Sequence, residues 1–150
     1  MHGAETVLGD IESLDLGRTF PAVVLASYLV NTADRDQRRA FLDACARHVT
    51  PQGMVLIQRA HPHVRWVGSD AYESTYGDVR IRTRVRAWEG NVLHAVAEYS
   101  IGDRTWTQEY RSELLDAEAI QDQLGRSGLT IRGWLDEGRE WLRAATRGEP

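Results

Sequence analysis

Three polar side chains follow the most apolar stretch of the chain, and this position is typical of a ligand site. The stretch runs from Ala22 to Ala26 without a charge, and Ser27, Tyr28 and Asn31 come directly after it. Such a short apolar run indicates a strand covered on both faces, as in a parallel sheet flanked by helices. Ligands bind beyond the carboxyl ends of strands in open α/β sheets. We therefore expect these three residues to line a pocket, the alternative being that they only end a strand and cap a helix.

A second group of candidates lies in the polar and aromatic segment from Arg59 to Gly77, which shows no clear periodicity. A loop of this length inside a compact domain is more often functional than idle. Its His61 could act as a general base for an acceptor hydroxyl, because the pKa of a free imidazole is about 6.5. The alternative is an exposed loop histidine beside Pro62. Trp66, in the same segment, is a candidate for binding a substrate.

The sequence does not indicate a metal site or a nucleophilic serine. His61 and His63 lack carboxylates at a ligand spacing, as do Cys45 and His48, and Cys45 falls on the apolar stripe of a helix. Ser27 lacks the flanking glycines that expose the serine of a hydrolase. We predict that the protein holds no metal.

Composition favours one soluble, cytoplasmic domain over residues 1–150. Hydrophobic residues make up 42% of the chain and charged residues 27%, which suits a globular fold. The formal charge of -4 argues against a nucleic-acid partner. A single cysteine fits a reducing compartment, and no apolar run approaches the roughly 20 residues needed to cross a membrane.

The first half of the chain predicts a βαβ unit. The strand at Ala22–Ala26 is followed by Asp34, a good helix cap, and by an amphipathic helix over residues 35–48. Thr50 to Gly53 then predicts a turn, and Met54 to Ile57 a second buried strand.

The second half predicts an antiparallel meander and a final helix with two strands. Apolar residues alternate strictly with arginines from Val79 to Trp88, and hairpin turns lead on to strands at residues 92–101 and 105–111. We expect the arginines at 80, 82, 84 and 86 to pair with Glu98 and Glu109 across strands, a phosphate site being the alternative. A helix over residues 114–127 with Asp116 as its cap, and strands at 129–135 and 141–145, complete the chain.

The order of these segments resembles the second half of a class I S-adenosylmethionine-dependent methyltransferase, especially the bacterial small-molecule members. The segments that carry the resemblance are VLGDIESLDL, RTFPAVVLASYLVN, ARHVTPQGMVLIQRAHP, YSIGDRTWTQEY, LGRSGLTIRGWLDEG and EWLRA, between Thr6 and Ala145. The resemblance implies an α/β fold with a truncated Rossmann-like methyltransferase sheet and an attached antiparallel β-meander. It also implies S-adenosylmethionine as the cofactor and a small molecule of secondary metabolism as the substrate.

The resemblance also implies roles for individual residues. Asp10 matches the acidic residue that meets the adenine amino group of the cofactor. The segment from Ser27 to Asn31 matches the one beside the methionine part of the cofactor and the methyl acceptor, which makes Ser27 a cofactor-binding candidate and Tyr28 and Asn31 substrate-binding candidates. The segment that contains Arg59 and His61 matches the one that faces the acceptor pocket.

The chain departs from the family's pattern at its front. The first strand, the glycine-rich loop and the second strand of the family have no counterpart, and the thirteen glycines include no Gly-x-Gly pair. Since close backbone approach to the cofactor needs glycine, we expect little cofactor affinity from this chain alone. The family's first strand lies beside the fourth, so we expect an open edge at Ala22–Ala26, covered by a second copy of the chain in a homodimer or by a partner chain.

Three functions remain open at this point. The chain could be a methyltransferase-derived protein that needs a second polypeptide for methyl transfer. It could be a cofactor-independent catalyst, such as a cyclase, that uses the acceptor pocket. It could be a non-catalytic interaction subunit.

Overall fold

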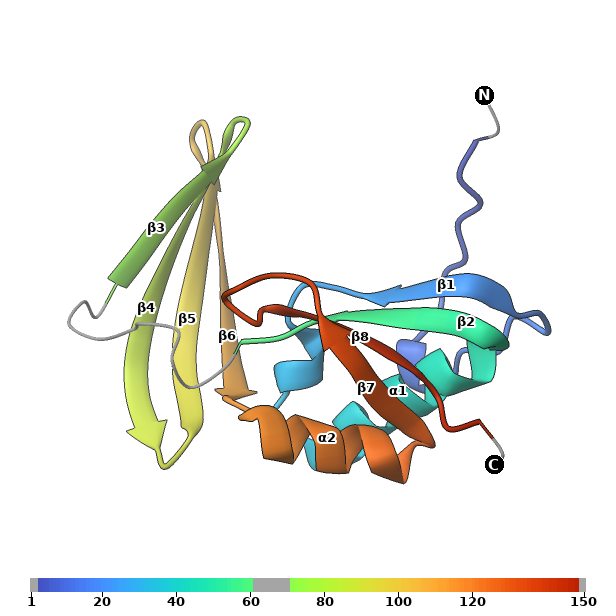
Figure 1. Ribbon diagram of the computed structural model, residues 1–150. Helices are drawn as coiled ribbons and strands as arrows, with labels where there is room; N and C mark the ends of the chain where they lie inside the picture. Colours follow the sequence, from blue (N-terminus) through green and yellow to red (C-terminus); the bar gives the residue numbers. More distant parts are fainter. Residues whose placement is uncertain (1–2, 61–70, 149–150) are drawn as a thin grey trace.

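Two four-stranded sheets make up the protein in the computed structural model, which describes residues 3–60 and 71–148. The first, called the core sheet, has the strand order β1-β2-β8-β7, and the second, called the meander, has the order β3-β4-β5-β6. Figure 1 shows the meander standing beside one end of the core sheet, while both α-helices lie below the core sheet. The space where the carboxyl ends of β1 and β2 approach the meander is where the candidate site is built.

The predicted βαβ unit is confirmed. Strand β1 (Phe20–Leu25), helix α1 (Arg35–His48) and strand β2 (Val49–Gln58) follow one another, and β1 pairs with β2 in parallel. The side chain of Asp34 accepts hydrogen bonds from the backbone amides of residues 36 and 37, at 3.0 Å each. These bonds satisfy two of the free amides at the start of the helix. A 3-10 turn, η2 (Leu29–Asn31), connects β1 to α1, and another, η1 (Ile11–Ser13), precedes β1.

The other two strands of the core sheet are antiparallel. Strand β8 (Trp141–Thr146) pairs with β2, and β7 (Leu129–Trp134) pairs with β8. Helix α2 (Ala117–Arg126) precedes β7 and is shorter than the predicted helix over residues 114–127. The predicted cap, Asp116, is confirmed, because its carboxylate accepts from the amide of Ala119 at 2.8 Å. Gly128 ends the helix with a φ of +74°, a conformation that glycine adopts without a steric cost.

The meander has one strand more than the sequence predicted. Strands β4 (Val79–Glu89), β5 (Val92–Ile101) and β6 (Arg104–Glu113) are those expected, and β3 (Ala71–Tyr76) adds to them by pairing with β4. The prediction of an aperiodic loop up to Gly77 was therefore wrong for residues 71–76. Strand β3 lies at the edge of the sheet and both of its faces are largely exposed, so its sequence carries no hydrophobic alternation.

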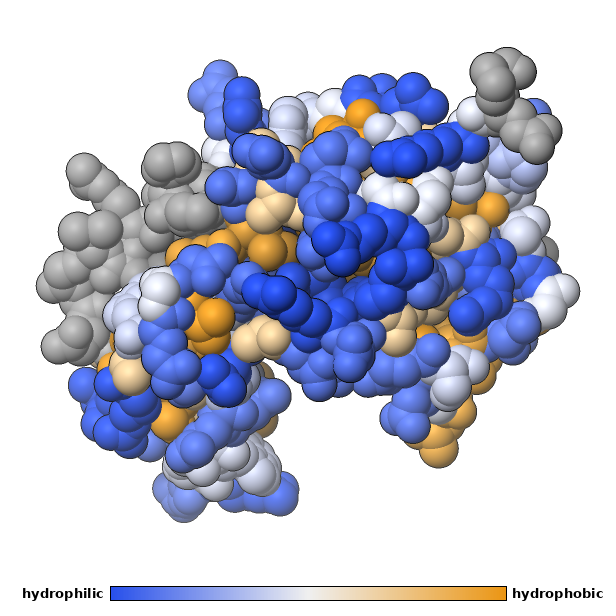
Figure 2. All heavy atoms as spheres, turned by 90° about the horizontal axis from the view of Figure 1, so that it is seen from below, coloured by the Kyte–Doolittle hydropathy of each residue, from blue (hydrophilic) through white to orange (hydrophobic). Residues whose placement is uncertain are grey.

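One face of the core sheet packs against both helices. The buried cluster joins inward side chains of the strands with apolar side chains of α1 and α2, among them Leu25, Val55, Ile57, Leu142, Phe41, Leu42, Ile120 and Leu124. The outer surface of the helix layer is mainly hydrophilic (Figure 2). Hydrophobic burial between the sheet and this single layer of helices holds the βαβ unit together.

The opposite face of the core sheet is not covered by any of the described residues. Its side chains on the first two strands are Ala22, Val24, Met54 and Leu56, which stand opposite one another in the register of β1 and β2. Val24 is 57% exposed and Met54 40%. The prediction that this strand is buried on both faces was wrong for the described residues, because both helices lie on one side. We call these four residues the uncovered face.

The segment Thr50–Gly53 belongs to β2 and is not the predicted turn. The pairing of β1 and β2 is irregular there, since Phe20 faces Val49 whereas Ala22 faces Met54. Gly53 fits this irregularity because a Cβ on it would lie 2.9 Å from the backbone oxygen of Pro21 and 2.7 Å from the hydroxyl of Thr50. The proline and glycine in this segment therefore accompany an irregularity in strand pairing and not a turn. The same residue types are common in both, so the sequence does not distinguish them.

Replacing Gly53 with alanine is expected to destabilise the protein by about 1–3 kcal/mol, because the added methyl group pushes β1 and β2 apart. Urea unfolding of the variant measures the change. Gly133→Ala is the matched control, since Gly133 also lies in a strand of the core sheet and a Cβ there meets nothing within 4 Å. Equal midpoints for the two variants would contradict the close approach.

A buried polar joint connects the meander to the core sheet. Arg38 of α1 is 1% exposed and its guanidinium donates to the carboxylate of Glu113 at 2.6 Å. The same guanidinium donates to the backbone oxygens of Val30 at 2.8 Å and Thr32 at 2.5 Å. Burial raises the pKa of Glu113, but the hydrogen bond and charge of Arg38 outweigh it and hold that pKa below its usual value. The carboxylate at the end of β6 is therefore charged and tied to the helix.

Candidate functional site

The chain turns sharply where β1 ends. Ser27 and Tyr28 both have left-handed backbone conformations, with φ of 58° and 56°, which is costly for residues with side chains. The amide of Ser27 donates to the side-chain oxygen of Gln58 at 3.0 Å, which ties the end of β1 to the end of β2. Strained backbone of this kind is common at functional sites and persists only where neighbouring contacts hold it.

The turn brings together a phenol, an amide and a carboxylate. The hydroxyl of Tyr28 donates to Oε1 of Glu140 at 2.7 Å, and Nε2 of Gln58 donates to the same oxygen at 2.6 Å. Glu140 comes from the turn between β7 and β8, far away in the sequence. Arg139, directly before Glu140, also has a positive φ. Among the described residues, Ser27, Tyr28 and Arg139 are the non-glycine residues with this conformation. We call Tyr28, Gln58 and Glu140 the carboxylate cluster.

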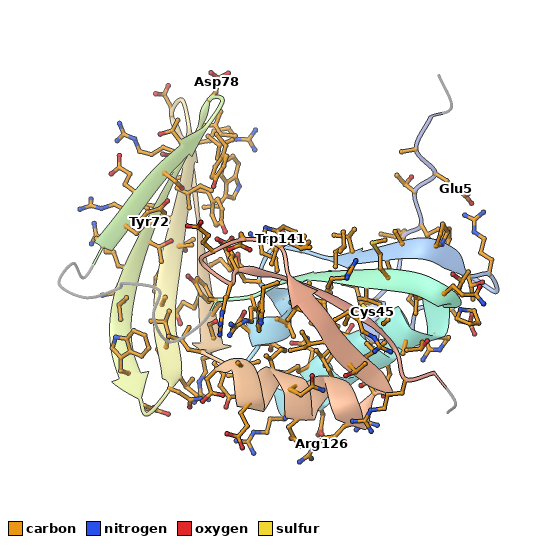
Figure 3. All side chains as sticks on the ribbon, viewed as in Figure 1. Glu5, Cys45, Tyr72, Asp78, Arg126 and Trp141 are labelled. Atoms are coloured by element: carbon orange, nitrogen blue, oxygen red, sulfur yellow. The ribbon has the colours of Figure 1, made fainter. Side chains whose placement is uncertain are left out.

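Tyrosines of the meander lie close to the carboxylate cluster. Burial, the hydrogen bond to Glu140 and its negative charge raise the pKa of Tyr28, with smaller contributions from Tyr72 and Tyr76 of β3. Figure 3 shows Tyr72 on the meander and Trp141 at the end of the core sheet that faces the meander. The Tyr28 phenol therefore stays protonated and serves as a hydrogen-bond donor to the carboxylate.

Arg59 follows β2 and contacts the carboxylate cluster through its backbone amide, which donates to the backbone oxygen of Glu140 at 2.8 Å. Its side chain is 2% exposed, a terminal nitrogen of the guanidinium donates to the backbone oxygen of Leu115, and the guanidinium lies 4.4 Å from the ring of Trp134. Its Nε atom has no hydrogen-bond partner among residues 3–60 and 71–148. Burial, with the nearby charge of Arg139, lowers the pKa of Arg59. Since the guanidinium is buried, a role in positioning Trp134 fits it better than the predicted contact with a substrate.

Asn31 is also buried, at 1% exposure. Its amide nitrogen donates to the backbone oxygens of Ala60 and Glu113, both at 2.7 Å, and its oxygen accepts from the amide of Ala60 at 2.7 Å. These bonds join η2, the chain after β2 and the end of β6. Every polar group of the side chain is thus used in holding the three segments around the cluster.

Of the remaining predicted site residues, the structure describes only Asp10, which is not part of the cluster. Asp10 is exposed before η1, and its side chain does not cap that turn. The residue after it, Ile11, lines an apolar cavity of about 300 Å³ along β1, with Ala26, Leu29 and residues of α1. His61 and Trp66 lie outside the described residues, so their roles stay predictions.

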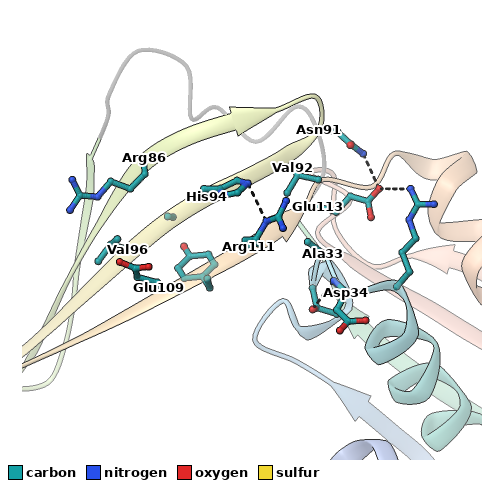
Figure 4. A pocket seen from close by; sticks show the side chains of 14 residues that line it. Ala33, Asp34, Arg86, Asn91, Val92, His94, Val96, Glu109, Arg111 and Glu113 are labelled. Atoms are coloured by element: carbon teal, nitrogen blue, oxygen red, sulfur yellow. Dashed lines mark hydrogen bonds and ion pairs between the residues drawn. The ribbon is translucent and has the colours of Figure 1, made fainter.

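A larger cavity, of about 800 Å³, lies between the meander and the start of α1. Figure 4 shows Ala33 and Asp34 facing side chains of β5 and β6 across it. Charged groups in and around the cavity pair with one another: Arg111 contacts His94 at 3.1 Å and Glu89 at 3.0 Å. The register also places Arg82 opposite Glu98, and an ion pair joins Arg80 of the predicted arginine stripe to Glu73 at 3.4 Å.

Three further features bear on the possible functions. Within residues 3–60 and 71–148, no group of three or more His, Cys, Asp or Glu side chains could hold a metal ion. The lone thiol, Cys45, is buried against the sheet, and burial raises its pKa to about 11, so it is protonated at neutral pH. No helix in the described part of the chain is long and apolar enough to cross a membrane.

Comparison with known proteins finds the same fold in solved methyltransferases. An S-adenosylmethionine-dependent methyltransferase from Clostridium acetobutylicum aligns with a TM-score of 0.74 and 14% identity, over 95% of this chain and 64% of that one. A sugar N-methyltransferase from a Streptoalloteichus species aligns at 0.70 and 23% identity, over 93% and 61%. An amino pentose methyltransferase from Micromonospora echinaspora aligns at 0.64 and 23%, over 93% and 63%.

These likenesses confirm an α/β fold that matches methyltransferase structures. The chain spans less than two thirds of the length of the structures that it matches. The sequence matches no protein-family model, and the search of curated proteins gives no match either. At such identities the similarity is one of fold, and what the cluster does has to be argued from its own side chains.

The sequence identified Tyr28 but not the acid that it contacts. Glu140 lies in a short turn after Asp136, whose carboxylate accepts from the amides of Glu140 and Trp141 at 3.0 and 2.7 Å. Nothing in the spacing links this turn to β1, because β8 is inserted beside β2 through antiparallel pairing. The only local signal is a carboxylate directly before a predicted strand.

Proposed function

We propose that this chain is the acceptor-binding part of an S-adenosylmethionine-dependent methyltransferase that acts on a small molecule. The observation that carries the proposal is the carboxylate cluster at the carboxyl ends of the parallel strands β1 and β2. That is where ligands bind in open α/β sheets, and the meander brings Tyr72 and Tyr76 close to it. The fold of solved methyltransferases along more than nine tenths of the chain supports the same reading.

The chain's own residues suit the acceptor better than the cofactor. Binding a sulfonium cofactor with a carboxylate and a ribose requires backbone amides that approach it closely, which glycine permits. The described glycines with positive φ stand singly at turns and at a helix end, and none of them follows a parallel strand. Ser27 and Asp10 remain the candidates for cofactor contacts on this side, beside the end of β1 and the apolar cavity.

We infer that the remainder of the cofactor site comes from polypeptide outside these 150 residues. This additional polypeptide would also cover the uncovered face and the free edge of β1. The edge strand pairs with β2 alone among the described strands, and its exposed apolar residues are a hazard unless they are covered. The matched structures have more than a third of their length outside the aligned part. A second chain of that kind would bring the methyl donor to the acceptor beside Tyr28.

An amine is the acceptor that the cluster favours. Two of the matched structures are N-methylating or amino-sugar enzymes by name, and a carboxylate beside tyrosines suits a cationic nitrogen. Methyl transfer to nitrogen requires a free lone pair, so a base must remove a proton. His61 is the proposed base, since it follows Ala60, whose amide Asn31 holds at 2.7 Å.

Calorimetric titration with S-adenosylmethionine and S-adenosylhomocysteine tests the division of the site. For the 150-residue chain we expect a dissociation constant weaker than about 100 μM, equivalent to less than roughly 5.5 kcal/mol of binding free energy. Addition of a polypeptide with a strand, a glycine-rich loop and an acidic second strand should restore tighter binding. Tight binding by the chain alone would instead mean that it completes the cofactor site without another polypeptide, and turnover of a substrate without any cofactor would contradict methyl transfer.

A further inference from the structure

The carboxylate of Glu140 is held in place by hydrogen bonds, and no described cation forms an ion pair with it. Oε1 accepts two hydrogen bonds, from Tyr28 and Gln58, whereas Oε2 has no hydrogen-bond or ion-pair partner in residues 3–60 and 71–148. The backbone on both sides is fixed as well, because the amide of Glu140 donates to Asp136 at 3.0 Å and its carbonyl accepts from Arg59 at 2.8 Å. The orientation of Oε2 is therefore set by four contacts that do not involve it.

Two described arginines, one directly before Glu140 and one bonded to it through the backbone, contact an aromatic ring. The guanidinium groups of Arg59 and Arg139 lie over the ring of Trp134, at 4.4 and 5.7 Å from its centre. The buried carboxylate of Glu113, by contrast, pairs with the guanidinium of Arg38 at 2.6 Å. The half-buried carboxylate of Glu140 therefore presents a negatively charged oxygen beside the hydroxyl of Tyr28.

We propose that Oε2 of Glu140 binds the protonated amine of the acceptor and that Tyr28 and Gln58 position it for this contact. This assignment rests on the proposed function and adds to it the group that selects a cationic acceptor. An ammonium group donates a charge-assisted hydrogen bond to a carboxylate oxygen that has no other partner. Glu140 is a binding residue in this scheme, and removal of the amine proton is left to the base.

The test compares two probes that differ only in charge: the methyl glycoside of an aminohexose, and the same glycoside with a hydroxyl in place of the amine. Binding to the 150-residue chain is followed by two-dimensional NMR, with the side-chain amide signals of Gln58 as the local reporter. Glu140→Gln removes the charge and keeps the shape of the side chain. Glu137→Gln is the matched control, because it removes the same charge from an exposed position in the same turn.

We expect the amine probe to bind the parent chain and the Glu137→Gln variant equally, and the Glu140→Gln variant about tenfold or more weakly. The hydroxyl probe should bind weakly to all three. Equal binding of the amine by both variants, or equal binding of the two probes by the parent chain, would overturn the role of Glu140 and leave the methyltransferase proposal standing. If the added polypeptide restores S-adenosylmethionine binding but the amine probe does not bind, the role of Glu140 is overturned in the same way. If the added polypeptide does not restore cofactor binding, that result counts only against the proposed function.

Discussion

Replacing Arg38 with methionine is expected to lower the free energy of unfolding by about 3–5 kcal/mol, because it removes the buried cation that pairs most closely with the carboxylate of Glu113. Arg38 is almost inaccessible to solvent and also donates to two backbone oxygens at the entry to α1. Since natural domains are stable by only about 5–15 kcal/mol, the variant could be largely unfolded. Urea denaturation followed by circular dichroism measures the loss.

The control is an exposed arginine of the same helix. Arg39 pairs with Asp43 at 2.9 Å, both side chains being more than 40% exposed, so Arg39→Met should change stability by less than about 0.5 kcal/mol. The double variant Arg38→Met with Glu113→Leu should recover part of the loss, because no charge then remains buried. Equal stability of the Arg38 and Arg39 variants would show that the joint between the sheets does not depend on this pair.

The same joint should depend on pH in a defined direction. The pKa of Glu113 is lower in the folded protein than in the unfolded chain, so its pairing stabilises the fold above the unfolded value of about 4.3. This stabilisation is lost as the pH falls through the lower, folded value. The difference in stability between the parent chain and Glu113→Gln should therefore be full at pH 7 and shrink below about pH 4, and a constant difference would contradict the pairing.

The purified chain is expected to associate with itself when the covering polypeptide is absent, and Val24→Lys should restore a monomer. The uncovered face lies beside a free strand edge, and a charge at such a position is a common means of preventing edge pairing. The fold itself should change little, by about 0.5 kcal/mol or less, because Val24 is mostly exposed. Size-exclusion chromatography with light scattering over a range of concentrations measures the change.

Val7→Lys is the matched control for this experiment. Val7 is 56% exposed against 57% for Val24, and it lies in the segment before η1, outside both sheets. We expect the Val7 variant to associate as the parent chain does. A parent chain that is monomeric at every concentration, or two lysine variants that behave alike, would count against an interface on the uncovered face.

The sequence alone determined the elements that are specified by residues close together in the chain, such as helix starts and half-exposed strands. The capping carboxylates of Asp34 and Asp116 sit where the helices begin, because a free amide at a helix start needs an acceptor within a few residues. The alternation from Val79 to Trp88 predicted a half-exposed strand for the same reason, since side chains of a strand point to opposite faces in turn. The order of such elements was enough to suggest the methyltransferase-like fold that the comparisons find.

Long-range pairing decided what the sequence could not. Strand β3 shows no alternation of apolar and polar residues. It is held in the sheet by its pairing with β4 and not by burial of its own apolar side chains. The apolar run of β1 predicted burial on both faces, but only the packing of both helices on one side revealed an uncovered face. Glu140 reaches Tyr28 across 112 positions of the chain because β8 pairs with β2, and no periodicity records such a contact. Residue types and spacing therefore predicted the end of the sheet where the site lies, whereas strand pairing determined which side chains meet there.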